Sequence, residues 1–313
     1  MHILAVCLAL LALFLLLLLL VYRKTFYAGR RKMSPYGMPH GMPEMGEKTR
    51  ELVAALEARP AERIVITAHD GTRLSARYHH VRDGAPLQIQ CHGYRGHASR
   101  DFCGGNPLAA SLGHNTLLID QRAHGESGGH TITFGIRERF DILDWISYAR
   151  GRFGEVPIIL VGISMGGASV LMASGEPLPA TVSGVIADCP YSSPREIICS
   201  VIRRMHLSPR LAYPLVSIAA RLFGRFSLSE CTALEAVTRA DIPILLLHGE
   251  EDGLVPVEMS QRIAEAGGAR VRLVTFPGAD HGMSYVVDPV RYGDAVSCFL
   301  NDCLTAGEKG QDL

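Results

Sequence analysis

The chain has 313 residues, of which 48 % are hydrophobic and 20 % are charged, and its acidic and basic side chains balance at 31 each. This balance argues against a polyanionic partner such as nucleic acid. The 8 cysteines stand at irregular spacings, which favours free thiols in a reducing compartment over a disulfide framework.

The first element is an uncharged apolar segment from Ile3 to Tyr22. As a helix rising 1.5 Å per residue, it spans roughly the 30 Å hydrocarbon core of a bilayer. A cleavable signal peptide is the alternative, but a basic region is missing before the segment and no small-residue cleavage site follows it. We therefore predict a transmembrane anchor in residues 1–22, with residues 3–22 in the bilayer.

Basic residues dominate the segment that follows the anchor. Residues 23–46 hold Arg23, Lys24, Arg30, Arg31 and Lys32, with no acid until Glu44. Because positive charge collects on the cytoplasmic side of membrane segments, we expect a single-pass membrane protein with the domain after the anchor on the cytoplasmic side. The Met, Pro and Gly content of residues 33–46 indicates a spacer between anchor and domain.

Residues 47–313 alternate between helix and strand patterns and are expected to form one domain. A helix is predicted over Glu47–Arg59 and an opening hairpin over Ile64–Ala68 and Leu74–His79. Further strands are expected at Leu87–Cys91, Thr116–Ile119, Val156–Val161, Val182–Ala187, Ile244–Leu247 and Val271–Phe276, and helices at Pro107–Leu112, Arg137–Arg150, Ala168–Ser174, Val257–Ala266 and Tyr285–Leu304. Short alternation of this kind predicts an α/β domain with a mostly parallel sheet covered on both faces.

A serine between glycines marks the most distinctive motif. Residues 162–167 read Gly-Ile-Ser-Met-Gly-Gly and stand directly after the predicted strand ending at Val161. A sharp strand-to-helix turn strains the serine and lifts its side chain above the sheet. The sequence therefore predicts Ser164 as a nucleophile, with the backbone N–H of Met165 directed toward an oxyanion formed beside it.

Two partners for the serine follow in the order acid, then histidine. Asp252 follows the strand that ends at Leu247, and His281 stands on a small-residue loop after the strand that ends at Phe276. An acid that orients a histidine, and a histidine that takes the serine proton, complete a triad. The alternatives for the acid are Asp188 and Glu251. The alternatives for the histidine are His92, His97, His124 and His248.

The chain order Ser, Asp, His resembles the α/β-hydrolase superfamily, in particular its esterase and acylglycerol-lipase-like branch, which includes serine aminopeptidase-like proteins. The resemblance covers residues 60–305 and includes His92-Gly93-Tyr94 and the loop 120–129. It implies the α/β-hydrolase fold, with a helical cap inserted after the sixth strand. It also implies that the backbone N–H of Tyr94 completes the oxyanion hole, while the side chain of Tyr94 could be only a pocket wall. Tight turns suggest that loop 120–129 braces the active-site floor.

The segment at about 192–234 breaks the alternation and is expected to form this cap over Ser164. Apolar residues recur there at helical spacing with arginines between them, which favours an apolar acyl group, although the same residues could simply attach the cap to the core.

These features together predict a membrane-anchored serine hydrolase that cleaves carboxylic esters with apolar or lipid-like acyl groups. No metal or organic cofactor is required by such chemistry. A thioesterase, a short-peptide serine peptidase and an acyltransferase would use the same triad. A catalytically silent binding or scaffold protein is the alternative outside the enzymes.

Overall fold

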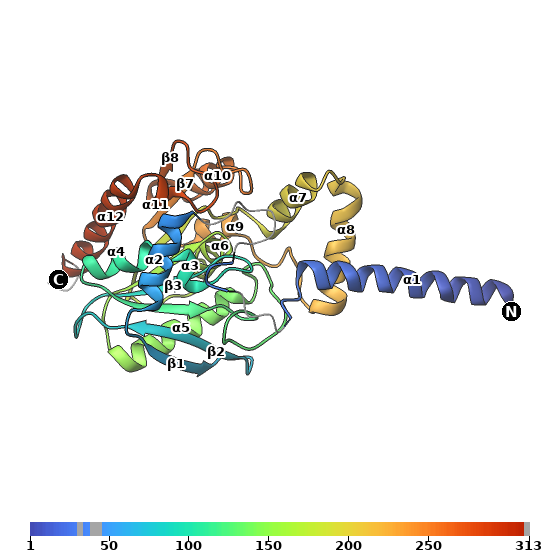
Figure 1. Cartoon of the computed structure of the whole chain (residues 1–313), viewed down its shortest axis with the longest axis horizontal. Coiled ribbons are helices and arrows are strands. Elements are labelled where there is room, and N and C mark those ends of the chain that lie inside the picture. Colours follow the sequence, from blue (N-terminus) through green and yellow to red (C-terminus); the bar gives the residue numbers. More distant parts are fainter. Residues whose placement is uncertain (30–33, 38–45, 310–313) are drawn as a thin grey trace.

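The computed structural model describes residues 1–29, 34–37 and 46–309, so much of the predicted basic segment and spacer lies outside the described residues. Figure 1 shows a central sheet with helices on both faces and a long N-terminal helix projecting from one side. The strands are β1 (Glu62–Thr67), β2 (Arg73–His79), β3 (Leu87–Cys91), β4 (Asn115–Asp120), β5 (Ile158–Ile163), β6 (Val182–Asp188), β7 (Ile244–Gly249) and β8 (Val271–Phe276).

The helices fall between and around these strands. They are α1 (His2–Thr25), α2 (Glu47–Glu57), α3 (Ala98–Asp101), α4 (Gly105–Ser111), α5 (Glu138–Phe153), α6 (Met165–Ser174), α7 (Pro194–Arg204), α8 (Pro209–Ala219), the short π-helix η1 (Ala220–Gly224), α9 (Ala233–Arg239), α10 (Glu258–Gly267), the 3₁₀ turn η2 (Gly268–Arg270), α11 (Ser284–Val287) and α12 (Pro289–Lys309).

The eight strands form one sheet in the order β1-β2-β4-β3-β5-β6-β7-β8. The opening hairpin β1–β2 is antiparallel, as is the pairing of β2 with β4, and all other neighbours are parallel. The predicted α/β-hydrolase fold, a mostly parallel sheet flanked by helices, is confirmed.

Both faces of the sheet are buried, which explains the continuous apolar runs in its central strands. Along β5, Ile158 and Leu160 join a core beneath α5, α6 and α10, whereas Ile159 and Val161 join a core beneath α3 and α12. This alternation follows from the two-residue period of a strand. It leaves the carboxyl ends of the parallel strands as the edge at which loops can carry functional side chains.

The chain between β6 and β7 leaves the layered core. It forms α7, α8 and η1, of which α8 and η1 lie beside the end of α1 in Figure 1. The return helix α9 packs against α6. The cap segment is thus inserted after the sixth strand.

The N-terminal helix α1 is 24 residues long, with a mean hydropathy of 3.4 over its most apolar window. Its length and composition suit a membrane span, and a signal sequence can share both properties. Most of its side chains are exposed, whereas Leu18 and Tyr22 are buried against the rest of the protein.

The prediction of one continuous helix near the C-terminus is wrong. The expected helix Tyr285–Leu304 is divided into α11 and α12 at Asp288. Pro289 has no backbone N–H to donate and disfavours helical backbone at the residue before it. Asp288 accordingly has φ −139° and ψ 80°.

Candidate active site

Ser164 stands between β5 and α6 in a strained backbone conformation. Its φ is +55° and its ψ is −114°, and its N–H donates to the carbonyl oxygen of Asp188 at 2.8 Å. Glycines permit this turn, because a Cβ at Gly162 would overlap the backbone of Gly166, and a Cβ at Gly166 would overlap the carbonyl group of Cys91. Strain held in place by its surroundings is common at functional sites.

The structure brings Ser164, His281 and Asp252 together in one chain of hydrogen bonds. The Oγ of Ser164 lies 2.9 Å from Nε2 of His281, and Nδ1 of His281 lies 2.7 Å from Oδ2 of Asp252. A carboxylate only accepts, so Nδ1–H donates to Asp252 and Nε2 is left to accept from the serine hydroxyl. The imidazole is therefore oriented as a base toward the serine.

Asp252 is 7 % exposed, and it is held on both carboxylate oxygens. Its Oδ1 accepts from the backbone N–H groups of Leu254 and Val255 at 2.9 and 2.8 Å. Burial opposes ionisation, but hydrogen bonds from His248 and His281 outweigh it and hold the pKa of Asp252 well below its usual range. The acid is consequently an anion at neutral pH.

The rival acids do not contact His281. Asp188 is buried at the end of β6, where its Oδ1 accepts from the Ser284 hydroxyl at 3.5 Å, and burial raises the pKa of its carboxyl to about 6. Glu251 is exposed on the turn before Asp252. Among the described carboxylates, the hydrogen bond to the His281 imidazole is made by Asp252.

The rival histidines have structural partners. His92 accepts from the backbone N–H of Gln121 at 3.1 Å, and His124 accepts from that of Arg95 at 3.0 Å. Burial lowers the pKa of His92 to about 4 and that of His124 to about 3, so both are neutral. His97 accepts the N–H of Ser99 at the start of α3.

His248 has a closer relation to the triad than its sequence position indicated. Its Nε2 lies 2.9 Å from the carbonyl oxygen of Val255 and 3.2 Å from Oδ2 of Asp252, and its Nδ1 lies 2.7 Å from the Ser260 hydroxyl. The ring therefore fixes the loop that carries the acid. No local pattern indicated this contact, because His248 lies within β7 and Asp252 lies on the loop after that strand.

Tyr94 and Met165 lie on the two turns that meet at the serine. A Cβ placed on Gly93, the residue before Tyr94, would stand 3.4 Å from Cβ of Ser164. Within the described part of the chain, the backbone N–H groups of Tyr94 and Met165 donate no hydrogen bond to another protein group. Two backbone N–H groups without a protein acceptor, placed beside a nucleophile, are suited to stabilise an oxyanion.

Other residues hold the turn of Tyr94 in place. Oδ2 of Asp101 accepts from the N–H of Gly93 at 2.7 Å, and Oδ1 pairs with Arg100 at 2.7 Å. The Tyr94 hydroxyl donates to the carbonyl oxygen of Thr25, and its ring stacks on Phe134. Sequence reasoning missed Asp101 and Thr25, because no local motif links either of them to the serine.

Loop 120–129 braces the site rather than entering the triad. The Ser127 hydroxyl accepts from the N–H of Ser75 on β2 and donates to the carbonyl oxygen of Asp120. Arg122 pairs with buried Asp141 on α5 at 2.5 Å. These bonds tie the loop to the sheet and to a helix, in agreement with a structural role.

Cys189 is a buried thiol beside the triad. Its Sγ lies 4.0 Å from Nε2 of His281, and its own backbone has φ +43°. Burial raises the pKa of this thiol well above its usual value, so it is protonated at neutral pH. A neutral thiol is a weak nucleophile and leaves the imidazole to Ser164.

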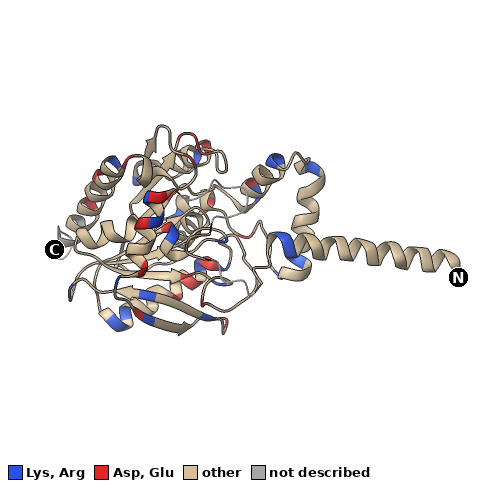
Figure 2. Cartoon of the chain, viewed as in Figure 1, with Lys and Arg blue, Asp and Glu red and all other residues tan. Residues whose placement is uncertain are grey.

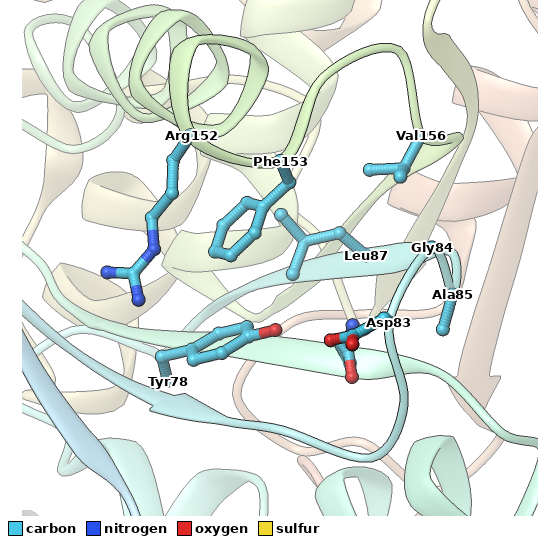
Figure 3. Close-up of a pocket in the computed structure, with 9 residues that line it drawn as sticks. Tyr78, Asp83, Gly84, Ala85, Leu87, Arg152, Phe153 and Val156 are labelled. Atoms are coloured by element: carbon cyan, nitrogen blue, oxygen red, sulfur yellow. The ribbon is translucent and has the colours of Figure 1, made fainter.

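A separate hollow of about 200 Å³ lies away from this site (Figure 3). Its lining includes Tyr78, Leu87 and Phe153, with Arg152 placed over the ring of Tyr78. It opens at the amino end of β3, whereas Ser164 follows the carboxyl end of β5. Its lining holds no nucleophile and base in contact, so we assign it no catalytic role.

The sequence of this chain is similar to a family model and to known proteins. A family model described as the alpha/beta hydrolase fold matches residues 89–227. The uncharacterized protein YqkD of Bacillus subtilis is 29 % identical over 62 % of this chain and 65 % of its own length. The human protein ABHD12B is 26 % identical over 65 % of this chain and 58 % of its own length.

Solved structures agree over more of the chain. The Pyrococcus furiosus esterase Pf2001 has a TM-score of 0.65 at 23 % identity and covers 86 % of this chain and 99 % of its own. Est1E of Butyrivibrio proteoclasticus, solved with ferulic acid bound, has a TM-score of 0.61 at 23 % identity, covering 77 % of this chain and 99 % of its own. The matching sheet, family model and solved structures show that this chain has the α/β-hydrolase fold.

Proposed function

We propose that the protein is a membrane-anchored serine hydrolase that cleaves carboxylic esters with apolar or lipid-like acyl groups. The observation that carries this proposal is the hydrogen-bonded series Ser164–His281–Asp252, with distances of 2.9 and 2.7 Å. The backbone donors at Tyr94 and Met165 stand beside it. Each group that acyl transfer needs is within reach of the serine.

The chemistry follows from these positions. His281 accepts the Ser164 proton as the serine oxygen attacks the ester carbonyl, and anionic Asp252 stabilises the imidazolium that forms. The N–H groups of Tyr94 and Met165 receive the oxyanion, and one such donor typically lowers the barrier by roughly 3 kcal/mol. His281 then protonates the leaving alcohol, which leaves an acyl group on Ser164. A water deprotonated by His281 releases the acid.

The apolar surroundings of the site support an apolar acyl group. Met165 belongs to a cluster of buried side chains that also includes Tyr191, Ile198 of α7 and Val216 of α8. The same cluster continues to Leu18 of the N-terminal helix. An acyl chain would therefore meet apolar side chains between the serine and α1.

A chain-length series tests the substrate class. Full-length protein in detergent should hydrolyse p-nitrophenyl esters with an optimum at intermediate acyl length, and Ser164→Ala should abolish the activity. Aminoacyl anilides should react slowly, because the apolar cluster offers nothing to bind a peptide amine. The reverse ranking would indicate a peptidase. Faster cleavage of acyl thioesters would indicate a thioesterase, and a strong preference for added alcohol over water would indicate an acyltransferase.

We further propose the division into an anchor at 1–22, a juxtamembrane segment at 23–46 and a hydrolase domain at 47–313 with its cap at about 192–234. The uncharged length of α1 supports the anchor. The basic residues that follow it support a cytoplasmic domain. A C-terminal alkaline phosphatase fusion should be inactive in that orientation, and an active fusion would reverse it.

A further inference from the structure

The cap helices α8 and η1 pack directly against the end of α1. The ring of Tyr22 lies 5.7 Å from that of Phe223 on η1. Leu18 is 1 % exposed and shares a buried cluster with Val216 and Ala219 of α8. In Figure 1, α8 runs across the axis of α1 rather than along it. A membrane plane perpendicular to α1 would thus run along α8.

The outer side of the cap is apolar and exposed. Leu211 is 77 %, Ile218 43 % and Leu222 49 % exposed, and their spacing of seven and four residues places them on one face of the helix. Val201 on α7, and Met205 and Leu207 between α7 and α8, are also large, apolar and exposed. Side chains of this size gathered on one surface indicate a contact surface, whereas single exposed ones do not.

The charge of the cap is of one sign. From Ile197 to Ser229 the chain has no acidic residue, and it carries Arg203, Arg204, Arg210, Arg221 and Arg225. Arg203, Arg210, Arg221 and Arg225 are exposed, and no acid pairs with them within the described ranges. Figure 2 shows blue and tan without red around α8 and the adjoining end of α1. This charge is complementary to an anionic surface.

The position at which α8 contacts α1 matches the depth of the membrane interface. Arg23 and Lys24 end the apolar run of α1, and Leu18 lies five residues before Arg23. At 1.5 Å per residue, the contact with α8 is about 7 Å inside the last charges. Amphipathic helices lie about 5–10 Å deep, at the boundary of headgroups and acyl chains.

We propose that the outer face of α8 and η1 is a membrane-docking surface that inserts into the bilayer interface beside α1 and prefers anionic phospholipid. This proposal rests on the proposed anchor. Leu211, Ile218 and Leu222 enter the acyl region while the arginines contact phosphate groups. The cap is thereby held at the membrane, and the apolar cluster below it opens toward lipid.

Site-specific fluorescence in vesicles tests the surface. Full-length protein, with the partly accessible cysteines Cys7, Cys199 and Cys298 changed to Ser, carries one new cysteine labelled with a polarity-sensitive dye. The labelled positions are Leu211→Cys on α8, Leu11→Cys on α1 and Val65→Cys on β1; Leu11 is 52 % and Val65 45 % exposed. Vesicles of phosphatidylcholine and phosphatidylglycerol contain lipids brominated on the acyl chains, which quench only dyes in the bilayer.

The proposal expects quenching of at least about twofold for dyes at residues 211 and 11, and none at residue 65. Quenching at residue 11 without quenching at residue 211 would overturn the docking surface and leave the anchor intact. No quenching at residue 11 would overturn the anchor itself. Oxidative disulfide cross-linking of the unlabelled Leu211→Cys variant between two copies, with no lipid quenching of the labelled one, would assign the face to a second copy of the chain.

A second comparison tests the lipid charge. Quenching at residue 211 should be stronger with phosphatidylglycerol than with phosphatidylcholine alone. The combined change Arg210→Gln, Arg221→Gln and Arg225→Gln should remove this difference, while Arg270→Gln, an exposed arginine outside the cap, should not. An unchanged preference in the triple variant would overturn the role of these arginines.

Discussion

The hydroxyl of Tyr94 donates a hydrogen bond to the backbone carbonyl oxygen of Thr25 at 2.7 Å. Arg95, the next residue, donates to the carbonyl oxygen of Lys24 at 2.8 Å. The end of the N-terminal helix thus contacts the turn that carries a proposed oxyanion donor. The proposed anchor and the proposed active site therefore adjoin each other.

We predict that Tyr94→Phe lowers kcat by roughly three- to tenfold with little change in KM, since a donor that is less well positioned weakens transition-state binding. The substitution keeps the backbone N–H of residue 94 and removes only the hydrogen bond from the side chain to Thr25. Steady-state kinetics on a p-nitrophenyl ester measures the effect. Tyr213→Phe on the cap is the matched control and should behave as wild type. A wild-type kcat in Tyr94→Phe would show that the Thr25 contact does not position the turn.

The identity of the acid is tested by replacing the carboxylate with an uncharged amide of the same shape at Asp252 and at Asp188. Asp252→Asn should lower kcat by about 10⁴, because an amide can stabilise the wrong imidazole tautomer and no longer supports the imidazolium. Asp188→Asn should cost far less, since Asp188 makes no hydrogen bond to His281. Comparable losses in the two variants would contradict the assignment of the acid. Circular dichroism of both proteins checks their folding.

Cys189 is predicted to be dispensable for catalysis. Cys189→Ala should retain kcat within about threefold, because a neutral buried thiol does not compete for the proton of Ser164. Fluorophosphonate labelling of this variant should equal that of wild type. A loss of labelling, with the unfolding midpoint unchanged, would give the thiol a role at His281 that the distance of 4.0 Å does not indicate.

Stability should fall as the solution becomes acidic. Burial lowers the pKa values of His79 and His92 to about 4 and that of His124 to about 3. The unfolded chain therefore binds more protons below about pH 6.5, and each histidine withdraws about 1.4 kcal/mol of stability per pH unit as pH falls from there toward 4. Asp188 and Asp141, whose pKa values burial raises to about 6, offset two of the three.

Denaturant unfolding in micelles at pH 7, 6 and 5 measures this slope. His79→Gln should reduce it by about one proton, since His79 pairs with Thr116 at the amino end of β4, at the edge of the sheet opposite Ser164. Stability that is constant or rises on acidification would refute the assignment of these histidines as buried neutral groups.

The sequence was informative wherever function depends on local pattern. The apolar strand that ends at Val161 and the serine between glycines in residues 162–167 together predict the strand-to-helix turn at Ser164. The strands that precede Asp252 and His281 predict at which edge of the sheet these residues stand. Contacts between distant segments leave no such pattern. Asp101, which supports Gly93, and Thr25, which receives Tyr94, look like ordinary helix and linker residues in the sequence.

Helix boundaries show a similar division. The predicted helix at Ala168 begins three residues earlier, at Met165, because the turn at Ser164 leads straight into helical backbone. The break at Asp288 was readable from Pro289, but the helical spacing on both sides concealed it. The packing of α8 on α1 joins segments far apart in the chain and depends on tertiary structure.

The most direct test of the account is labelling of full-length protein by a fluorophosphonate probe, with the adduct located by mass spectrometry. We expect one adduct, on Ser164, in the wild-type protein. Ser164→Ala should form no adduct, and His281→Gln should form far less, because the imidazole activates the serine. Well-folded wild-type protein that ignores the probe, or an adduct on another residue, would contradict the serine-hydrolase assignment and favour a binding protein on a hydrolase fold.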